Sequence, residues 1–220
     1  MPVMEPQQFS LARAKIYGFL SRVFHREMDE ELLKSMKIQG YPAIEDSELQ
    51  EAYQGLRIWL SEHPIDKRLT EDLAADYGSL FLGFGRHPAH PYESVYTTED
   101  GIVMGEPRNQ VVAFYERLGL RRLASFPEPD DHIALELAFM AFLCLEEENA
   151  SRGGKAKEAE EFLVLQRTFL DDHLSLWVPR FCDTILTASC KHDFYRYIAH
   201  LSRRFVLIER DTLAGLIETS

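Results

Sequence analysis

Acidic and histidine side chains crowd into one short stretch of the chain, Glu128-Pro129-Asp130-Asp131-His132, and Glu136 follows one helical turn later. Carboxylates bind arginine side chains and metal ions, and histidine binds metals or moves protons. One aspartate is enough to cap a helix, so this number of acids also suits the capture of a cation, a basic peptide or a metal. The stretch is therefore the first candidate for a functional site.

The residues that follow this stretch must form the element that positions it. From Ile133 to Leu145 only Glu136 is ionisable, and such a run is apolar around its whole circumference. A helix of this length spans about 20 Å, less than the roughly 30 Å of bilayer hydrocarbon. We therefore predict a buried central helix, about 133–145, which Asp130 or Asp131 caps at its start.

The composition limits the class of protein. The chain has 220 residues, 45% of them hydrophobic, and a net charge of −12. This charge argues against a nucleic-acid partner, which needs a basic face. Three cysteines without a CxxC pair, and no basic-then-apolar leader at Met1–Phe9, predict a cytoplasmic protein with reduced thiols and no stable membrane insertion.

Helical spacing of apolar residues dominates the rest of the chain, and no segment alternates over strand length. We predict an all-α fold, a single bundle-like domain over 1–220 with a hinge at 121–130 between its halves. The second helix should end at Gly40 and Pro42, and Pro179 should end a helix or start one. The predicted helices cover 8–24, 29–36, 48–59, 69–82, 107–118, 133–145, 155–177, 181–190 and 193–207, with a frayed turn at 211–218.

A long ordered loop is predicted at 83–105. It contains four glycines and two prolines together with several aromatic residues. Loops of this length inside a domain are uncommon and are usually functional or disordered, and the aromatic content favours order. A packed Ω-loop with aromatic anchors is the alternative.

Signals for enzymatic chemistry are weak. His132 and Glu136 lie four residues apart, as two metal ligands on a helix would, but a site needs three or four ligands. His192-Asp193 suggests an HD-type phosphohydrolase, whose further aspartate would have to be Asp211 near the end of the chain. Ser94 lacks a G-x-S-x-G elbow, and Cys144 lies in the predicted core.

Taken together, the motifs resemble the TorD/DmsD/NarJ-like redox enzyme maturation chaperones, nearest to the TorD and DmsD branch. The run from Glu128 to Leu137 matches the E-x-D-H signature of that family. Weaker matches are Asp76-Tyr77 with Leu80 to Gly83, the Pro91 to Tyr96 loop, and the stretch from Phe169 to Phe181. Tyr92 and Tyr96 stand where relatives often have tryptophan, which leaves the partner's identity open.

The resemblance implies a cytoplasmic chaperone that is not an enzyme and needs no cofactor or metal of its own. Such proteins bind the twin-arginine leader of a molybdenum-containing oxidoreductase, or its apo form, until the molybdopterin cofactor is loaded and export follows. The chain would act as a monomer or homodimer. A metal-dependent hydrolase and a general helical adaptor remain the alternatives.

We predict that the 83–105 loop and the Glu128–Glu136 helix start face each other across one groove. Acids would take the arginines of the leader, and loop aromatics would take its apolar part. The predicted peptide-binding residues are Phe84, Pro91, Tyr92, Glu93, Ser94, Tyr96, Glu128, Asp130, Asp131, His132 and Glu136.

Overall fold

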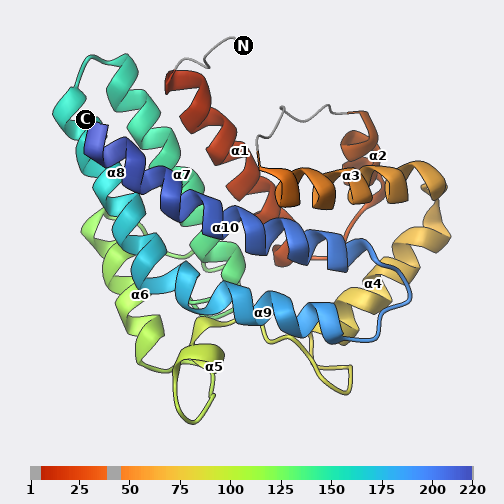
Figure 1. Ribbon diagram of the computed structural model, residues 1–220. Helices are drawn as coiled ribbons and strands as arrows, with labels where there is room; N and C mark the ends of the chain where they lie inside the picture. Colours follow the sequence, from red (N-terminus) through yellow and green to blue (C-terminus); the bar gives the residue numbers. More distant parts are fainter. Residues whose placement is uncertain (1–5, 39–45, 220) are drawn as a thin grey trace. The chain divides into compact units, whose positions relative to one another are not determined.

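The structure is a computed structural model that describes residues 6–38 and 46–219. Within these ranges every regular element is a helix, which confirms the all-α prediction (Figure 1). The elements are α1 (Pro6–His25), α2 (Glu30–Ile38), α3 (Ser47–Glu62), α4 (Lys67–Phe81), α5 (Glu93–Thr97), α6 (Glu106–Arg117), α7 (Ile133–Arg152), α8 (Ala156–Phe169), the π-helix η1 (Leu170–Leu174), α9 (Ser175–Thr187) and α10 (Phe194–Thr219). The predicted stop at Gly40 and Pro42 lies outside the described residues.

The chain divides into two compact units. Unit 1 comprises residues 1–25, 92–177 and 206–220, and unit 2 comprises residues 26–91 and 178–205. The segment 121–130 lies inside unit 1, and the hinge that we predicted there stays a prediction.

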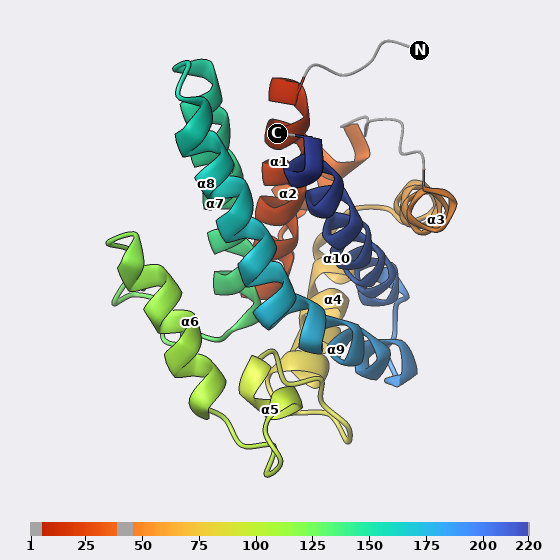
Figure 2. The same ribbon diagram turned by 60° about the vertical axis from the view of Figure 1, so that its left-hand side comes forward.

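Helix α7 is the core of unit 1, where α1 and α8 pack along it (Figure 2). Leu137, Met140 and Leu143 are buried, and burial raises the pKa of the Cys144 thiol to about 12, so that thiol stays protonated. The helix starts at the predicted residue but continues to Arg152 instead of stopping at 145. It continues because Glu147 is buried and accepts a hydrogen bond from the Ser10 hydroxyl at 2.7 Å.

A buried group of charged and amide side chains joins four helices of unit 1. We call it the ionic cluster and define it as Arg13 of α1, Glu147 of α7, Gln166 of α8 and Glu209 of α10. Arg13 Nε donates to both Glu209 carboxylate oxygens, at 3.0 and 2.8 Å, and its Nη2 donates to Gln166 Oε1 at 2.7 Å. Its Nη1 lies 3.6 Å from Glu147 Oε2. Although burial alone would lower the pKa of Arg13, the neighbouring Glu209 raises it above its ordinary value, so the guanidinium stays charged.

The region around Pro179 differs from the prediction. We expected one helix over 155–177 and a break at the proline, but a π turn follows α8 and the chain then continues as α9 with Pro179 inside it. The Ser175 N–H donates to the carbonyl of Leu170, five residues back. The π turn therefore changes the hydrogen-bond register just before the proline, and the fixed φ of proline is itself helical.

The C-terminal turn is also more regular than predicted, because α10 runs without interruption from Phe194 to Thr219. The sequence of its second half alone suggested fraying. In the structure Leu213 is fully buried and Glu209 belongs to the ionic cluster, so packing within unit 1 holds this half of the helix.

Aspartates cap two of the helices of unit 2 at their N-termini. Asp46 accepts a hydrogen bond from the Leu49 N–H at the start of α3, and Asp66 accepts one from the Leu69 N–H at the start of α4, at 2.8 and 2.9 Å. Asp76 of α4 is buried and accepts from the N–H groups of Lys191 and His192 at 2.7 and 2.9 Å. The aspartate beside Tyr77 thus fixes the turn between α9 and α10.

Of the helices that the structure describes, none is long and apolar enough to cross a membrane.

Candidate functional site

The acidic stretch and the middle of the 83–105 segment lie against each other in unit 1. Tyr92 and His132 form an isolated antiparallel bridge, and the Tyr92 hydroxyl donates to Glu128 Oε2 at 2.6 Å. The Glu93 N–H donates to the backbone carbonyl of Asp131 at 3.0 Å. The Ser94 N–H and hydroxyl both donate to Asp131 Oδ2, at 3.0 and 2.5 Å. Residues 92–94 are therefore fastened directly to residues 128–132.

Asp131 accepts hydrogen bonds from Ser94 at the start of α5 and does not cap α7, contrary to our prediction. The N-cap of α7 is His132, whose Nδ1 accepts a hydrogen bond from the Ala134 N–H at 3.1 Å. Burial, together with the nearby His25, lowers the pKa of His132 to about 3, so the ring is neutral at physiological pH and its Nδ1 can accept. The sequence contains two aspartates that could cap the helix, Asp130 and Asp131. Because Ser94 bonds to Asp131, the helix is capped by His132 instead.

Three buried carboxyl groups lie around the first turn of α7. We call the set of Glu93, Asp131, Glu136 and His173 the carboxyl cluster. His173 Nδ1 lies 2.9 Å from Glu93 Oε2, and the Trp177 indole donates to Glu136 Oε2 at 3.0 Å. Burial, with the charge of Glu93 as the next cause, raises the pKa of Glu136 well above its ordinary value. Glu136 Oε1 and Asp131 Oδ1 are buried without a hydrogen-bond partner among the described residues.

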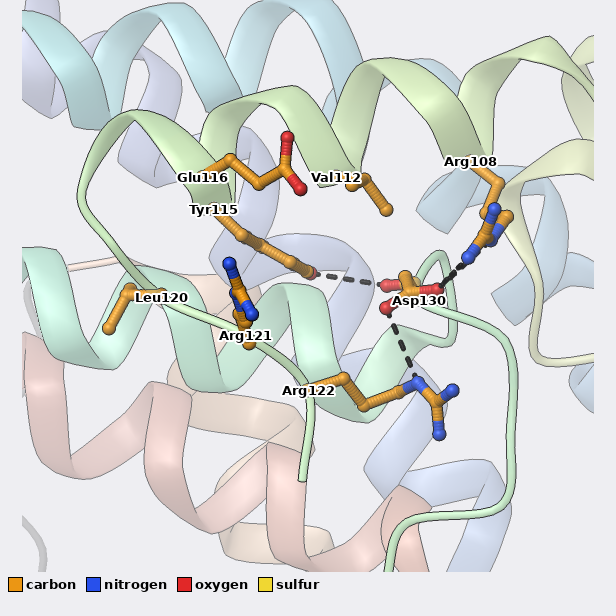
Figure 3. A pocket seen from close by; sticks show the side chains of 8 residues that line it. All are labelled: Arg108, Val112, Tyr115, Glu116, Leu120, Arg121, Arg122 and Asp130. Atoms are coloured by element: carbon orange, nitrogen blue, oxygen red, sulfur yellow. Dashed lines mark hydrogen bonds and ion pairs between the residues drawn. The ribbon is translucent and has the colours of Figure 1, made fainter. Parts of the chain in front are cut away.

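Asp130 points the other way, into a small pocket beside α6 (Figure 3). Arg108 donates to its Oδ2 from Nε and Nη2, at 2.9 and 2.5 Å, and Arg122 Nε donates to its Oδ1 at 3.3 Å. The Tyr115 hydroxyl donates to its backbone carbonyl at 3.2 Å. The pocket has a volume of about 190 Å³ and is also lined by Arg121.

These contacts correct one part of the sequence prediction. We expected these acids to bind the arginines of the leader, but Glu93, Asp130, Asp131 and Glu136 are all buried. All four have hydrogen-bond or ion-pair partners inside unit 1. An arginine of a bound peptide could reach them only by displacing these partners, and this makes direct arginine capture costly.

The predicted aromatic residues are placed in both units. In unit 1 Tyr96 stacks on Trp177 with ring centroids 5.6 Å apart, and Tyr92 packs edge-on against His132 at 5.4 Å. In unit 2 Pro91 is buried, whereas Phe84 is 81% exposed on a turn that follows α4. The groove as predicted joins residues of both units and stays a prediction.

Sequence reasoning missed several residues around the site. His173 and Trp177 lie in the Phe169 to Phe181 stretch, but nothing in the pattern showed that they reach Glu93 and Glu136. From the sequence we did not single out Arg108 and Arg122. Bases are fewer than acids in this chain, 24 against 36, so bases close to the acidic stretch were a usable signal. The apolar triplet Ile102–Met104 was overlooked, and its position between two glycines was a usable signal.

The two metal-site alternatives find different side-chain partners in the structure. His132 Nδ1 and Glu136 are occupied as described above. His192 Nε2 lies 3.4 Å from Asp72 Oδ2, and Asp193 pairs with Arg196 at 3.0 Å. Within residues 6–38 and 46–219, no three His, Cys, Asp or Glu side chains are arranged to hold a metal ion.

Comparison with known proteins points to one family. The family model described as "Nitrate reductase delta subunit" matches residues 44–183. The chaperone protein TorD of Shewanella sp. (strain ANA-3) is 30% identical over 215 residues, 92% of this chain and 94% of the relative. The chaperone protein TorD of Vibrio vulnificus (strain YJ016) is 28% identical over 218 residues, 97% of this chain and 100% of the relative. That of Aliivibrio salmonicida (strain LFI1238) is 28% identical over 216 residues.

The relatives are named as chaperones, which is a non-enzymatic role and agrees with the prediction that the chain is not an enzyme. Two of the segments that carry the resemblance, Glu128 to Leu137 and the Pro91 to Tyr96 loop, are joined in the structure through Glu128 and Asp131. The chain therefore belongs to the nitrate reductase delta subunit family, the TorD/DmsD/NarJ-like group of redox enzyme maturation chaperones.

Proposed function

We propose that this chain is a cytoplasmic chaperone for one molybdenum-containing oxidoreductase. It binds the twin-arginine leader of the client, or its apo form, and assists cofactor insertion before export. The observation that carries the proposal is the bonding of the Tyr92–Ser94 segment to the Glu128–His132 signature, on a chain whose relatives along almost its whole length are named chaperones.

The chemistry of such a leader sets what the chain must offer. A leader presents two guanidinium groups, which prefer carboxylates, followed by an apolar stretch, which prefers an apolar or aromatic surface. Tyr92, Tyr96 and Glu128 remain half-exposed, so they can contact a peptide directly. Asp131, His132 and Glu136 act behind them by holding α5 and the start of α7 in place.

Calorimetric titration with a synthetic twin-arginine leader tests the proposal. We expect saturable binding that weakens as salt rises, because guanidinium–carboxylate attraction is screened. A matched peptide with both arginines replaced by glutamine should bind more weakly. Equal binding of the two peptides, or a salt series without slope, would contradict recognition of the arginines.

Capture from the native cell tests the client. The tagged chain should retain a molybdenum-dependent oxidoreductase that still carries its leader and lacks cofactor. Deletion of the chaperone gene should lower the molybdenum content of that client. A chain that retains unrelated proteins and leaves molybdenum content unchanged is a general adaptor, and the proposal is then wrong. Light scattering at rising concentration would decide between monomer and homodimer.

A further inference from the structure

Three consecutive apolar side chains are exposed between α5 and α6. Ile102, Val103 and Met104 are 57%, 40% and 62% exposed, and Gly101 and Gly105 flank them. Isolated exposed apolar residues are ordinary, but an exposed run of three is unusual unless it contacts a partner. Met104 has a φ of 65°, the one positive φ of a non-glycine residue in the described ranges. The backbone is therefore in a strained conformation at the most exposed residue of the three.

The base of this loop is fixed to the site described above. The Gly105 N–H donates to the Ser94 hydroxyl at 3.0 Å, and that hydroxyl donates to Asp131 at 2.5 Å. A Cβ at Gly105 would lie 2.9 Å from the Thr98 methyl carbon, so glycine is needed for this close approach. The buried Asp131 thus holds the loop through Ser94, without itself reaching the surface.

The charges beside the triplet are acidic and exposed. Glu99 and Asp100 precede it, and Glu106 follows it. The nearest base in sequence, Arg108, is paired with Asp130. The loop 99–106, which we call the display loop, therefore combines an apolar tip with three exposed carboxylates, complementary to a segment with two arginines followed by apolar residues.

We propose that the display loop is the surface that receives the client leader. Ile102, Val103 and Met104 contact its apolar part, and Glu99, Asp100 and Glu106 face its arginines. Asp131 and Ser94 are positioning residues that fix the base of the loop. This inference rests on the proposed function and replaces the buried carboxylates with exposed ones as the groups that meet the arginines.

A triple substitution tests the apolar tip. The variant Ile102→Ser, Val103→Ser, Met104→Ser should lose at least about tenfold in affinity for a synthetic peptide with two adjacent arginines and a following leucine-alanine stretch. The control is Ile58→Ser, Val164→Ser, Leu176→Ser, whose side chains are similarly exposed at 57%, 46% and 54%. The control should bind the peptide like the wild type. Both variants should have the same circular dichroism spectrum as the wild type.

A charge variant tests the acids. Glu99→Gln, Asp100→Asn, Glu106→Gln should weaken binding at low salt and flatten its dependence on salt. The matched control is Glu51→Gln, Glu62→Gln, Glu71→Gln, three exposed acids of unit 2. An unchanged salt slope in the display-loop variant would overturn the assignment of the arginines to these carboxylates.

The positioning role has a readout that general destabilisation would not give. Ser94→Ala should speed hydrogen exchange at the Gly105 amide and weaken peptide binding. In the background of the triple serine variant it should cause no further loss of affinity, because the tip that it positions is already gone. A further independent loss would overturn the positioning role.

The outcomes separate the two proposals. If the wild type does not bind the peptide, the proposed function fails and this inference fails with it. If the wild type binds and the triple serine variant binds equally well, the proposed function stands and the display loop is refuted as its site. If the variant instead abolishes a dimer and leaves peptide affinity unchanged, the loop contacts a second copy of the chain, and the inference is wrong.

Discussion

The two buried polar groups of unit 1 contain similar side chains but differ in how charge is balanced. In the ionic cluster the guanidinium of Arg13 contacts Glu209 and Glu147 across three helices. In the carboxyl cluster Glu93, Asp131 and Glu136 have one histidine between them, and no arginine or lysine of the described chain lies within ion-pair distance of the three. The first arrangement is typical of a structural connection. The second leaves two carboxyl oxygens without a hydrogen-bond partner and raises the pKa of Glu136, as is common where a protein gives up stability for function.

Substitution of Arg13 should give the largest effect. Arg13→Met leaves Glu209 and Glu147 buried without their cation, and we expect a loss of about 3–5 kcal/mol in the free energy of unfolding. The control is Arg203→Met, which removes an exposed arginine 3.4 Å from Asp183 and should cost less than about 1 kcal/mol. Urea denaturation measures both, and equal losses would show that the ionic cluster adds nothing beyond a surface pair.

The change of a glutamate to glutamine should lower stability in the ionic cluster but not in the carboxyl cluster. Glu209→Gln removes a charge that Arg13 needs, and should cost about 2 kcal/mol. Glu136→Gln removes a carboxyl whose pKa is already raised, keeps an acceptor for Trp177, and should leave stability at pH 8 equal to or above that of the wild type. A carboxyl with a raised folded-state pKa contributes fully below its unfolded pKa and loses that contribution as pH rises. The advantage of Glu136→Gln should therefore grow from pH 5 to pH 8, and a variant that is less stable at pH 8 would contradict the raised pKa.

The titration of His132, the N-cap of α7, should make the stability of the fold decrease as pH falls. The folded-state pKa of His132, about 3, lies below that of an unfolded histidine, so its contribution is present above about pH 6.5 and falls as pH drops toward 3. Between pH 6.5 and pH 5 this amounts to about 2 kcal/mol. Asparagine also caps helices and does not titrate, so His132→Asn should flatten this part of the profile. The exposed His200→Asn serves as the control and should not change the slope.

The smallest effect should come from an exposed ion pair with a short distance between its charged atoms. Lys34 Nζ lies 2.6 Å from Glu30 Oε2, closer than any contact of Arg13, but both side chains are exposed. Lys34→Ala should cost no more than about 0.5 kcal/mol. A larger loss would mean that distance and not burial decides the difference between the clusters.

The sequence was sufficient where local chemistry decides the structure. The start of α7 at Ile133 follows from an uninterrupted apolar run, and the end of α6 follows from Gly119, which has a φ of 69°. It was insufficient where a distant residue decides. The second half of α10 is held by Arg13, which is 196 residues away in the chain. Asp131 accepts a hydrogen bond from Ser94, which lies 37 residues earlier in the chain, and does not cap the helix that follows it.

The candidate site shows the same division. The sequence singled out two segments with family motifs, Pro91–Tyr96 and Glu128–Leu137, and the structure shows them in contact. It did not indicate exposure, since a charged residue is expected at the surface unless its partners are known. Those partners, His173 and Trp177, come from a third segment.

The five-residue turn η1 has a consequence for side-chain direction. A π turn accommodates one residue more than an α turn, so it advances every following side chain by about 100° around the helix axis. Trp177, after the turn, donates to Glu136 in this advanced phase, while Phe169, before the turn, packs against Phe139. Removal of a single residue from 170–174 would restore an ordinary helix and swing the indole away from its acceptor, a change that no single side-chain substitution could reproduce.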